Sequence, residues 1–169
     1  MLLDTDGYPR LIRAAVIAAA GTDGPVVRVP DFGMEGVGVI WGVMTGGIAI
    51  TAGHWIGPAC VAEITVTAVR AASDYAEGSR VLTWLAAPLA IAFPVTGVPA
   101  AVAAKSMLSA IFTLRLAEEC VRHFAPPVFT PIHLLQLTGH IRGTIARLPR
   151  GEEITLVKTL LAVDSAMGR

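Results

Sequence analysis

Residues 36–62 read GVGVIWGVMTGGIAITAGHWIGPACVA, and this stretch decides which kind of fold the chain can adopt. It contains no Asp, Glu, Lys or Arg. About 20 apolar residues suffice for a helix to cross the hydrocarbon of a bilayer. Glycine weakens a helix in water, but in lipid an unpaired backbone costs far more than a poor helix propensity. The stretch therefore predicts a membrane-spanning helix.

Small residues recur within this stretch at spacings of three and four. They are Gly38, Gly42, Gly46, Ala49, Gly53 and Gly57. On one helix they would share a face that another backbone can approach closely, which is how many membrane helices associate. We therefore predict a helix-packing interface there. A glycine-rich loop or strand is the alternative, whereas a dinucleotide site would need a different glycine spacing.

His54 and Trp55 stand together inside the same uncharged stretch. An ionisable group within a membrane span suggests a pore-lining or proton-relay residue. Aromatic and amphipathic rings are also enriched where a membrane meets water. The pair is thus a candidate pore residue or interfacial anchor, and its sequence context favours the anchor.

A second uncharged run covers residues 81–104, between Arg80 and Lys105. Three prolines interrupt it, so a kinked span, a re-entrant segment or two helices all fit. Eleven of the thirteen basic residues precede the first run or follow the second, only Arg70 and Arg80 lie between them, and basic residues favour the cytoplasmic side. If both runs span, both termini are expected in the cytoplasm.

Polar stripes at helical spacing and proline starts predict further helices. They are expected at Pro9–Ala20, 58–77, 99–123, 131–148 and 152–166. The predicted fold is all-α, with one short extended piece at Val26–Val29. We divide it into an N-terminal adaptor segment (1–35), an apolar hairpin with a connecting amphipathic helix (36–104), and an amphipathic helical C-terminal part (105–169).

Composition excludes several classes of function. Acidic and basic residues balance at 13 each, which leaves no basic footprint for nucleic acid. Only 15% of residues are charged, against about 25% in a typical soluble protein, so apolar surface needs lipid or a partner. Cys60 and Cys120 form no metal or disulfide pattern.

The sequence carries no recognisable catalytic motif. His133 and His140 lie seven residues apart, which is too far along one helix to share an ion, so we predict no metal site. His123 precedes them on another predicted helix. No nucleophile elbow, phosphate-binding loop or zinc-protease motif occurs. We therefore predict no catalytic, cofactor-binding or metal-binding residues.

These observations lead to one leading functional hypothesis and two alternatives. The leading one is a non-catalytic, membrane-associated helical protein that self-associates or anchors a larger assembly, as a pore element or accessory subunit. Its partners would be the lipid bilayer and a homo-oligomer or larger complex. The first alternative is a soluble all-helical subunit of an obligate oligomer. The second is a small enzyme or apolar-ligand carrier with a pocket near Pro94–Pro99.

Overall fold

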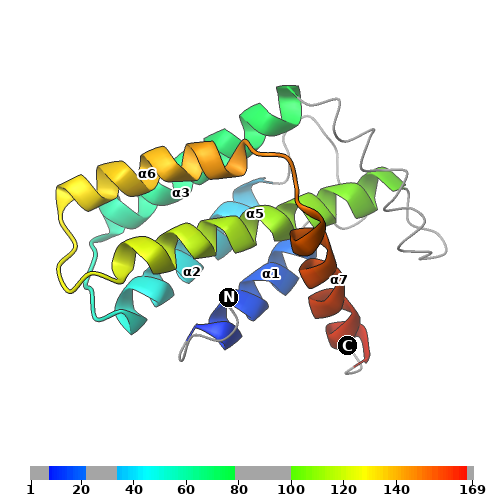
Figure 1. The fold of residues 1–169 in the computed structure, drawn as a ribbon, viewed down its shortest axis with the longest axis horizontal. Coiled ribbons are helices and arrows are strands. Elements are labelled where there is room, and N and C mark those ends of the chain that lie inside the picture. Colours follow the sequence, from blue (N-terminus) through cyan, green and yellow to red (C-terminus); the bar gives the residue numbers. More distant parts are fainter. Residues whose placement is uncertain (1–7, 22–33, 79–99, 167–169) are drawn as a thin grey trace.

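The computed structural model describes residues 8–21, 34–78 and 100–166. These residues form six helices and no strand, which confirms the all-α prediction (Figure 1). The helices are α1 (Pro9–Gly21), α2 (Met34–Thr51), α3 (Pro58–Gly78), α5 (Ala100–Phe124), α6 (Pro131–Ile145) and α7 (Gly151–Ala166).

Proline and its neighbours mark where several helices begin. Pro9, Pro58 and Pro131 each occupy a first helical position, where a missing backbone N–H costs nothing. Before α6, Thr130 is extended, and its backbone N–H donates to Nδ1 of His133, 3.0 Å away. Neighbouring residues, namely Thr130, Pro131 and His133, thus determine where α6 begins.

Helix α5 lies at the centre of the bundle. Every residue from Met107 to Ala117 is buried, which leaves no solvent-facing side over about three helical turns. Helices α1, α2, α6 and α7 all pack against α5, and α3 packs against α2 and α6 (Figure 1). The buried side chains of these contacts form one continuous hydrophobic core.

A buried hydrogen bond sets how α2 meets α5. The indole Nε1 of Trp41 donates to Oγ1 of Thr113 at 2.8 Å, and that hydroxyl donates to the carbonyl of Ser109 at 2.7 Å. Buried Trp N–H groups need such a partner. The pair therefore fixes the register of two helices that are 72 residues apart in sequence.

Arg115, only 2% exposed, joins α5 to the end of α6 and the start of α7. Its Nε and Nη2 each lie 2.8 Å from one carboxylate oxygen of Glu153. Its remaining N–H groups donate to the backbone carbonyls of Thr144, Ile145, Arg147 and Leu148 at 2.7–3.3 Å. The last carbonyls of a helix lack partners within the helix, so Arg115 satisfies groups that burial would otherwise penalise.

The prediction that residues 36–62 form a single spanning helix is wrong. The stretch is divided between α2 and α3, and residues 52–57 are not helical. Gly53 ends α2 because it adopts a positive φ of 84°, and Pro58 starts the next helix. Within the described ranges, none of the helices combines the length and the apolarity needed to cross a membrane.

Two other sequence predictions fall largely outside the described residues. The second uncharged run, 81–104, overlaps the structure only at its last residues, and the extended piece Val26–Val29 does not overlap it. The kinked-span hypothesis and the orientation of the termini that depends on it therefore stay predictions.

Candidate functional site

Two loops meet at one end of the bundle, where α2 and α5 end and α3 and α6 begin (Figure 1). His54 connects them, because its Nε2 lies 2.9 Å from the carbonyl oxygen of Phe124 and 2.9 Å from that of Pro126. A carbonyl can only accept, so Nε2 carries the proton and donates to both. The loop at residues 52–57 is thereby fastened to the loop at residues 125–130.

Aromatic rings pack beneath this junction. The ring of Phe129 lies 4.7 Å from that of Phe124, 6.1 Å from that of His54 and 6.0 Å from that of His133, measured between centroids. Aromatic pairs at these separations attract one another beyond the area they bury. The two loops therefore rest on a shared aromatic base.

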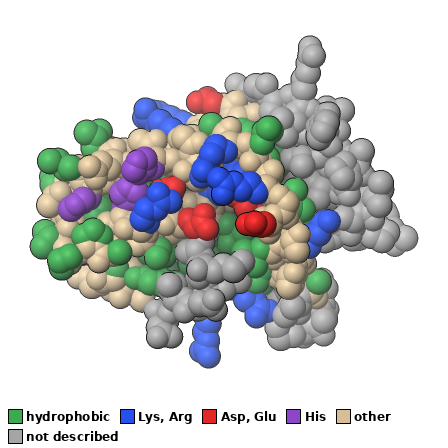
Figure 2. All heavy atoms as spheres, viewed as in Figure 1, with side chains coloured by type: hydrophobic (Ala, Val, Ile, Leu, Met, Phe, Trp, Pro, Cys, Tyr) green, Lys and Arg blue, Asp and Glu red, His purple; other side chains and the backbone are tan. Residues whose placement is uncertain are grey.

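Large apolar side chains project from the same end into solvent. Trp55 is 90% exposed, and Leu135 is 73% exposed. Val128 and Ile132 are also exposed. We call these four side chains the apolar end. In Figure 2, hydrophobic and histidine side chains gather at the left end, and the charged side chains lie nearer the centre.

The two loops at this end, and the adjoining turns of α2, α3 and α6, contain no formal charge, and Arg122 stands just before them in the last turn of α5. Residues 36–62 and residues 123–141 both lack Asp, Glu, Lys and Arg. Isolated exposed apolar side chains are ordinary on a protein surface. An almost fully exposed tryptophan beside three further exposed apolar side chains is less ordinary.

The structure separates the residues of the predicted glycine face. Gly38 and Gly42 lie against α3, where added Cβ atoms would sit 3.7 Å from Val69 Cγ2 and Thr65 Oγ1. Ala49 is buried in the core, and Gly46 faces open space. Gly53 and Gly57 lie beyond the end of α2, so the helix face does not extend to them.

Sequence reasoning missed the glycine that, among those the structure describes, leaves the least room for a side chain. A Cβ at Gly47 would lie 2.7 Å from Cδ2 of Leu11 on α1. Gly47 was not part of the three-and-four stripe, and only the approach of α1 reveals its role. The two glycines that touch α3 and the one that touches α1 serve packing inside this chain.

The outward side of α2 forms a second exposed apolar surface. Val39, Val43 and Ile50 recur on one helix face, and all three are exposed. Gly46 belongs to the same stretch of the helix and adds no side chain. Gly38 and Gly42 pack against α3, so this outward face is the part of α2 that stays accessible to another molecule.

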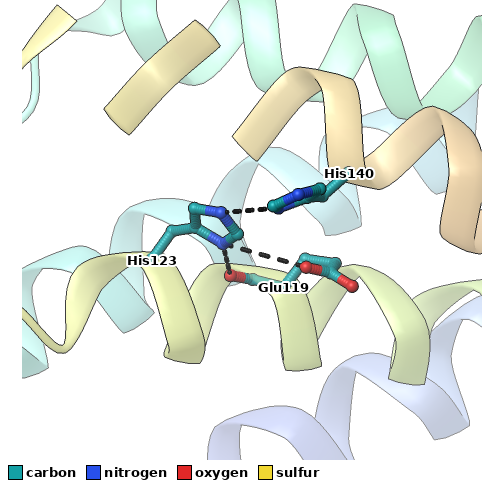
Figure 3. A group of neighbouring side chains, drawn as sticks. All are labelled: Glu119, His123 and His140. Atoms are coloured by element: carbon teal, nitrogen blue, oxygen red, sulfur yellow. Dashed lines mark hydrogen bonds and ion pairs between the residues drawn. The ribbon is translucent and has the colours of Figure 1, made fainter. Parts of the chain in front are cut away.

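The structure brings together two of the three histidines that the sequence placed on neighbouring helices. His123 on α5 lies beside His140 on α6, with Glu119 next to them, while His133 stays at the start of α6 (Figure 3). Spacing along α6 gave no sign of this, because the pair crosses between helices. The register of an α5–α6 hairpin would have revealed it.

The free thiols offer no reactive site. Burial raises the pKa of Cys120 to about 12, despite a contact between its Sγ and Thr45 Oγ1 at 3.8 Å. Partial burial also raises the pKa of Cys60, and the nearby charge of Glu63 adds to it. The thiolate is the nucleophile, so both thiols are poor ones.

Comparison of the chain with family models, with curated proteins and with solved structures gives no match.

Proposed function

We propose that this chain is a non-catalytic helical protein that associates with a lipid bilayer through its apolar end and anchors a larger assembly there. The observation that carries the proposal is Trp55, almost fully exposed on a loop between two helices. Tryptophan is enriched at membrane–water interfaces, where its ring is apolar and its N–H stays hydrated. The other three residues of the apolar end provide aliphatic side chains for the same contact.

The lack of charge in both segments supports a lipid partner. A surface that enters the interfacial layer must avoid the cost of desolvating charged groups. No acidic or basic residue occurs between residues 36 and 62 or between residues 123 and 141. Binding of this kind depends on buried apolar area and should respond weakly to salt and to lipid charge.

The hydrogen bonds of His54 also support the proposal. They tie the loop that carries Trp55 to the loop that carries Val128. A surface that is ordered before binding pays less conformational entropy on contact. His54 therefore positions the anchor, and Trp55 provides it.

Flotation of the purified full chain with lipid vesicles tests the proposal. One vesicle set is phosphatidylcholine alone, and the other contains phosphatidylglycerol as well. We expect the chain to float with both, at low and at high salt. Trp55→Ser or Leu135→Ser should lower the partition coefficient by about tenfold to a hundredfold, given about 1.5–3 kcal/mol for fully burying such a side chain.

Leu148→Ser is the matched control. The exposed fraction of Leu148, 68%, is similar to that of Leu135. Leu148, however, follows the C-terminus of α6, whereas the apolar end lies at the N-terminus of that helix. The control variant should bind vesicles as the unchanged chain does. An equal loss from Leu135→Ser and Leu148→Ser would contradict a specific apolar end, and failure to float with either vesicle set would overturn the proposal.

A subunit of an obligate oligomer is the second candidate, and the exposed face of α2 favours it. If Val39, Val43 and Ile50 meet a second copy, sedimentation equilibrium should give a defined oligomer without lipid. Val43→Glu should then dissociate it, because a buried unpaired carboxylate is costly. A monomer that floats with vesicles would exclude this candidate.

A further inference from the structure

A cluster of three side chains lies along the α5–α6 contact, outside the apolar end. His140 Nδ1 lies 2.9 Å from His123 Nε2, and His123 Nδ1 lies 2.9 Å from the carbonyl oxygen of Glu119 (Figure 3). The carbonyl only accepts, so His123 Nδ1 carries its proton and donates it. In the neutral ring, the lone pair of His123 Nε2 therefore faces His140.

The carboxylate of Glu119 is satisfied on one side only. Its Oε1 accepts from Thr144 Oγ1 at 2.7 Å and from Arg122 Nη2 at 3.1 Å. Its Oε2 is buried without a hydrogen-bond partner among the described residues, and it lies 3.8 Å from His123 Nδ1. A buried carboxylate oxygen left without a partner is costly, and it points to a cation that would satisfy it.

We propose that Glu119, His123 and His140 bind a divalent transition-metal ion of the Zn²⁺ class. Two imidazoles and one carboxylate are a ligand set that Zn²⁺ uses when a fourth position stays open to water. One ligand atom from each residue lies within 4.8 Å of the others. His140 is exposed, so the open position is reached from solvent.

Side-chain movement alone can form the site. Ligand atoms on a tetrahedral Zn²⁺ stand roughly 3.3 Å apart, given Zn–N bonds of about 2.0–2.1 Å. The two histidine nitrogens must separate by a few tenths of an ångström, and the Glu119 oxygen, which starts within 4.8 Å of them, must approach by up to about 1.5 Å. The exposed His140 ring and the carboxylate can make these changes while both helices stay in place.

Contacts outside the ligand set support this geometry. The hydrogen bond from His123 Nδ1 to a backbone carbonyl fixes the ring with the Nε2 lone pair toward His140, as is usual for metal-binding histidines. Both facing nitrogens can bind an ion once the proton on His140 Nδ1 moves to its Nε2. Thr144 holds the Glu119 carboxylate from the opposite helix. Arg122 opposes a cation, but its side chain is 62% exposed and can turn into solvent.

Titration of Zn²⁺ into the untagged, chelator-treated full chain tests the proposal by calorimetry. We expect one Zn²⁺ to bind per chain, and His140→Gln to weaken binding by at least about tenfold. His133→Gln is the matched control, because it replaces a histidine on the same helix and keeps a side chain that can cap α6. The control should bind as the unchanged chain does.

Co²⁺ gives a second measurement that depends on ligand geometry. Tetrahedral Co²⁺ bound by the unchanged chain should absorb in the visible range, and His140→Gln should abolish that absorption while its helical circular dichroism is preserved. Equal Zn²⁺ affinity of the unchanged chain and His140→Gln, or no binding by the unchanged chain, would overturn the proposal. Neither result bears on vesicle binding, because the two sites share no residue.

Discussion

At the scale of single residues, Arg115 has the largest set of polar contacts in the described part of the chain. Its guanidinium is buried, yet all its contacts are to a carboxylate or to backbone carbonyls. Burial of a charge without such partners would cost several kcal/mol. A planar group with five N–H donors suits this task, and the single ammonium of a lysine would not.

Glu153, the partner of Arg115, links this contact to pH. Partial burial alone would raise the pKa of Glu153, but hydrogen bonds from Arg115 and from the Arg150 backbone N–H, with both positive charges, outweigh it and lower the pKa. Ionised Glu153 therefore stabilises the fold above the unfolded carboxyl pKa of about 4.3. This stability is lost as pH falls through the lower pKa of the folded protein.

We expect Glu153→Gln to lower the free energy of unfolding by about 2 kcal/mol near neutral pH, since Arg115 keeps its carbonyl partners but loses its counter-ion. The gap between the two proteins should close in acid. Urea denaturation at a series of pH values measures it. Glu152→Gln, at the exposed neighbouring position, is the control. A pH-independent gap would contradict the assigned role of the Glu153 charge.

At the scale of helices, the α5–α6 hairpin explains why the Glu119–His123–His140 cluster exists. His123 faces His140, and Glu119 faces Thr144. Both pairs are centred on the same point of the chain, between residues 131 and 132. One antiparallel register therefore aligns them, and any shift of α6 along α5 would separate both pairs together.

The packing of α2 gives a prediction about two adjacent glycines. Gly46→Ala should raise the free energy of unfolding by about 0.5–1 kcal/mol, because alanine favours the helix and meets open space. Gly47→Ala should bring no gain or a loss of about 1 kcal/mol, because its Cβ displaces the Leu11 side chain. Chemical denaturation compares them, and equal stabilisation by both would refute the close approach of α1.

At the scale of the whole molecule, the sequence predicted the positions of the helices better than the loop between α2 and α3 or the contacts between helices. Proline and capping signals are local, so Pro9–Ala20 and 99–123 lie close to the observed α1 and α5. The helix start at Pro58 was predicted, but the non-helical residues 52–57 before it were not, because the long uncharged run outweighed the turn signal of Gly53. Contacts between different helices depend on how those helices are aligned along one another. No local sequence pattern therefore predicted the contact between His123 and His140 or the contact between Gly47 and Leu11.

The position of α5 at the centre predicts how the bundle opens. Amides from Met107 to Ala117 should exchange with solvent only on global unfolding, because every one of these residues is buried in a helix against which four others pack. Amides of the 52–57 loop should exchange much faster. Hydrogen exchange followed by mass spectrometry measures both, and similar protection of the two segments would contradict a fold built around α5.

The meeting of two helix starts and two helix ends at the apolar end has an electrostatic consequence. The peptide dipoles give a helix roughly half a positive charge at its start and half a negative charge at its end. The starts of α3 and α6 lie there beside the ends of α2 and α5, so the four partial charges cancel. Residues 36–62 and 123–141 add no charged side chain, and Arg122 in the last turn of α5 is paired with Glu119 at 3.1 Å. This end of the molecule therefore presents little net field and should not be drawn to a surface of either sign.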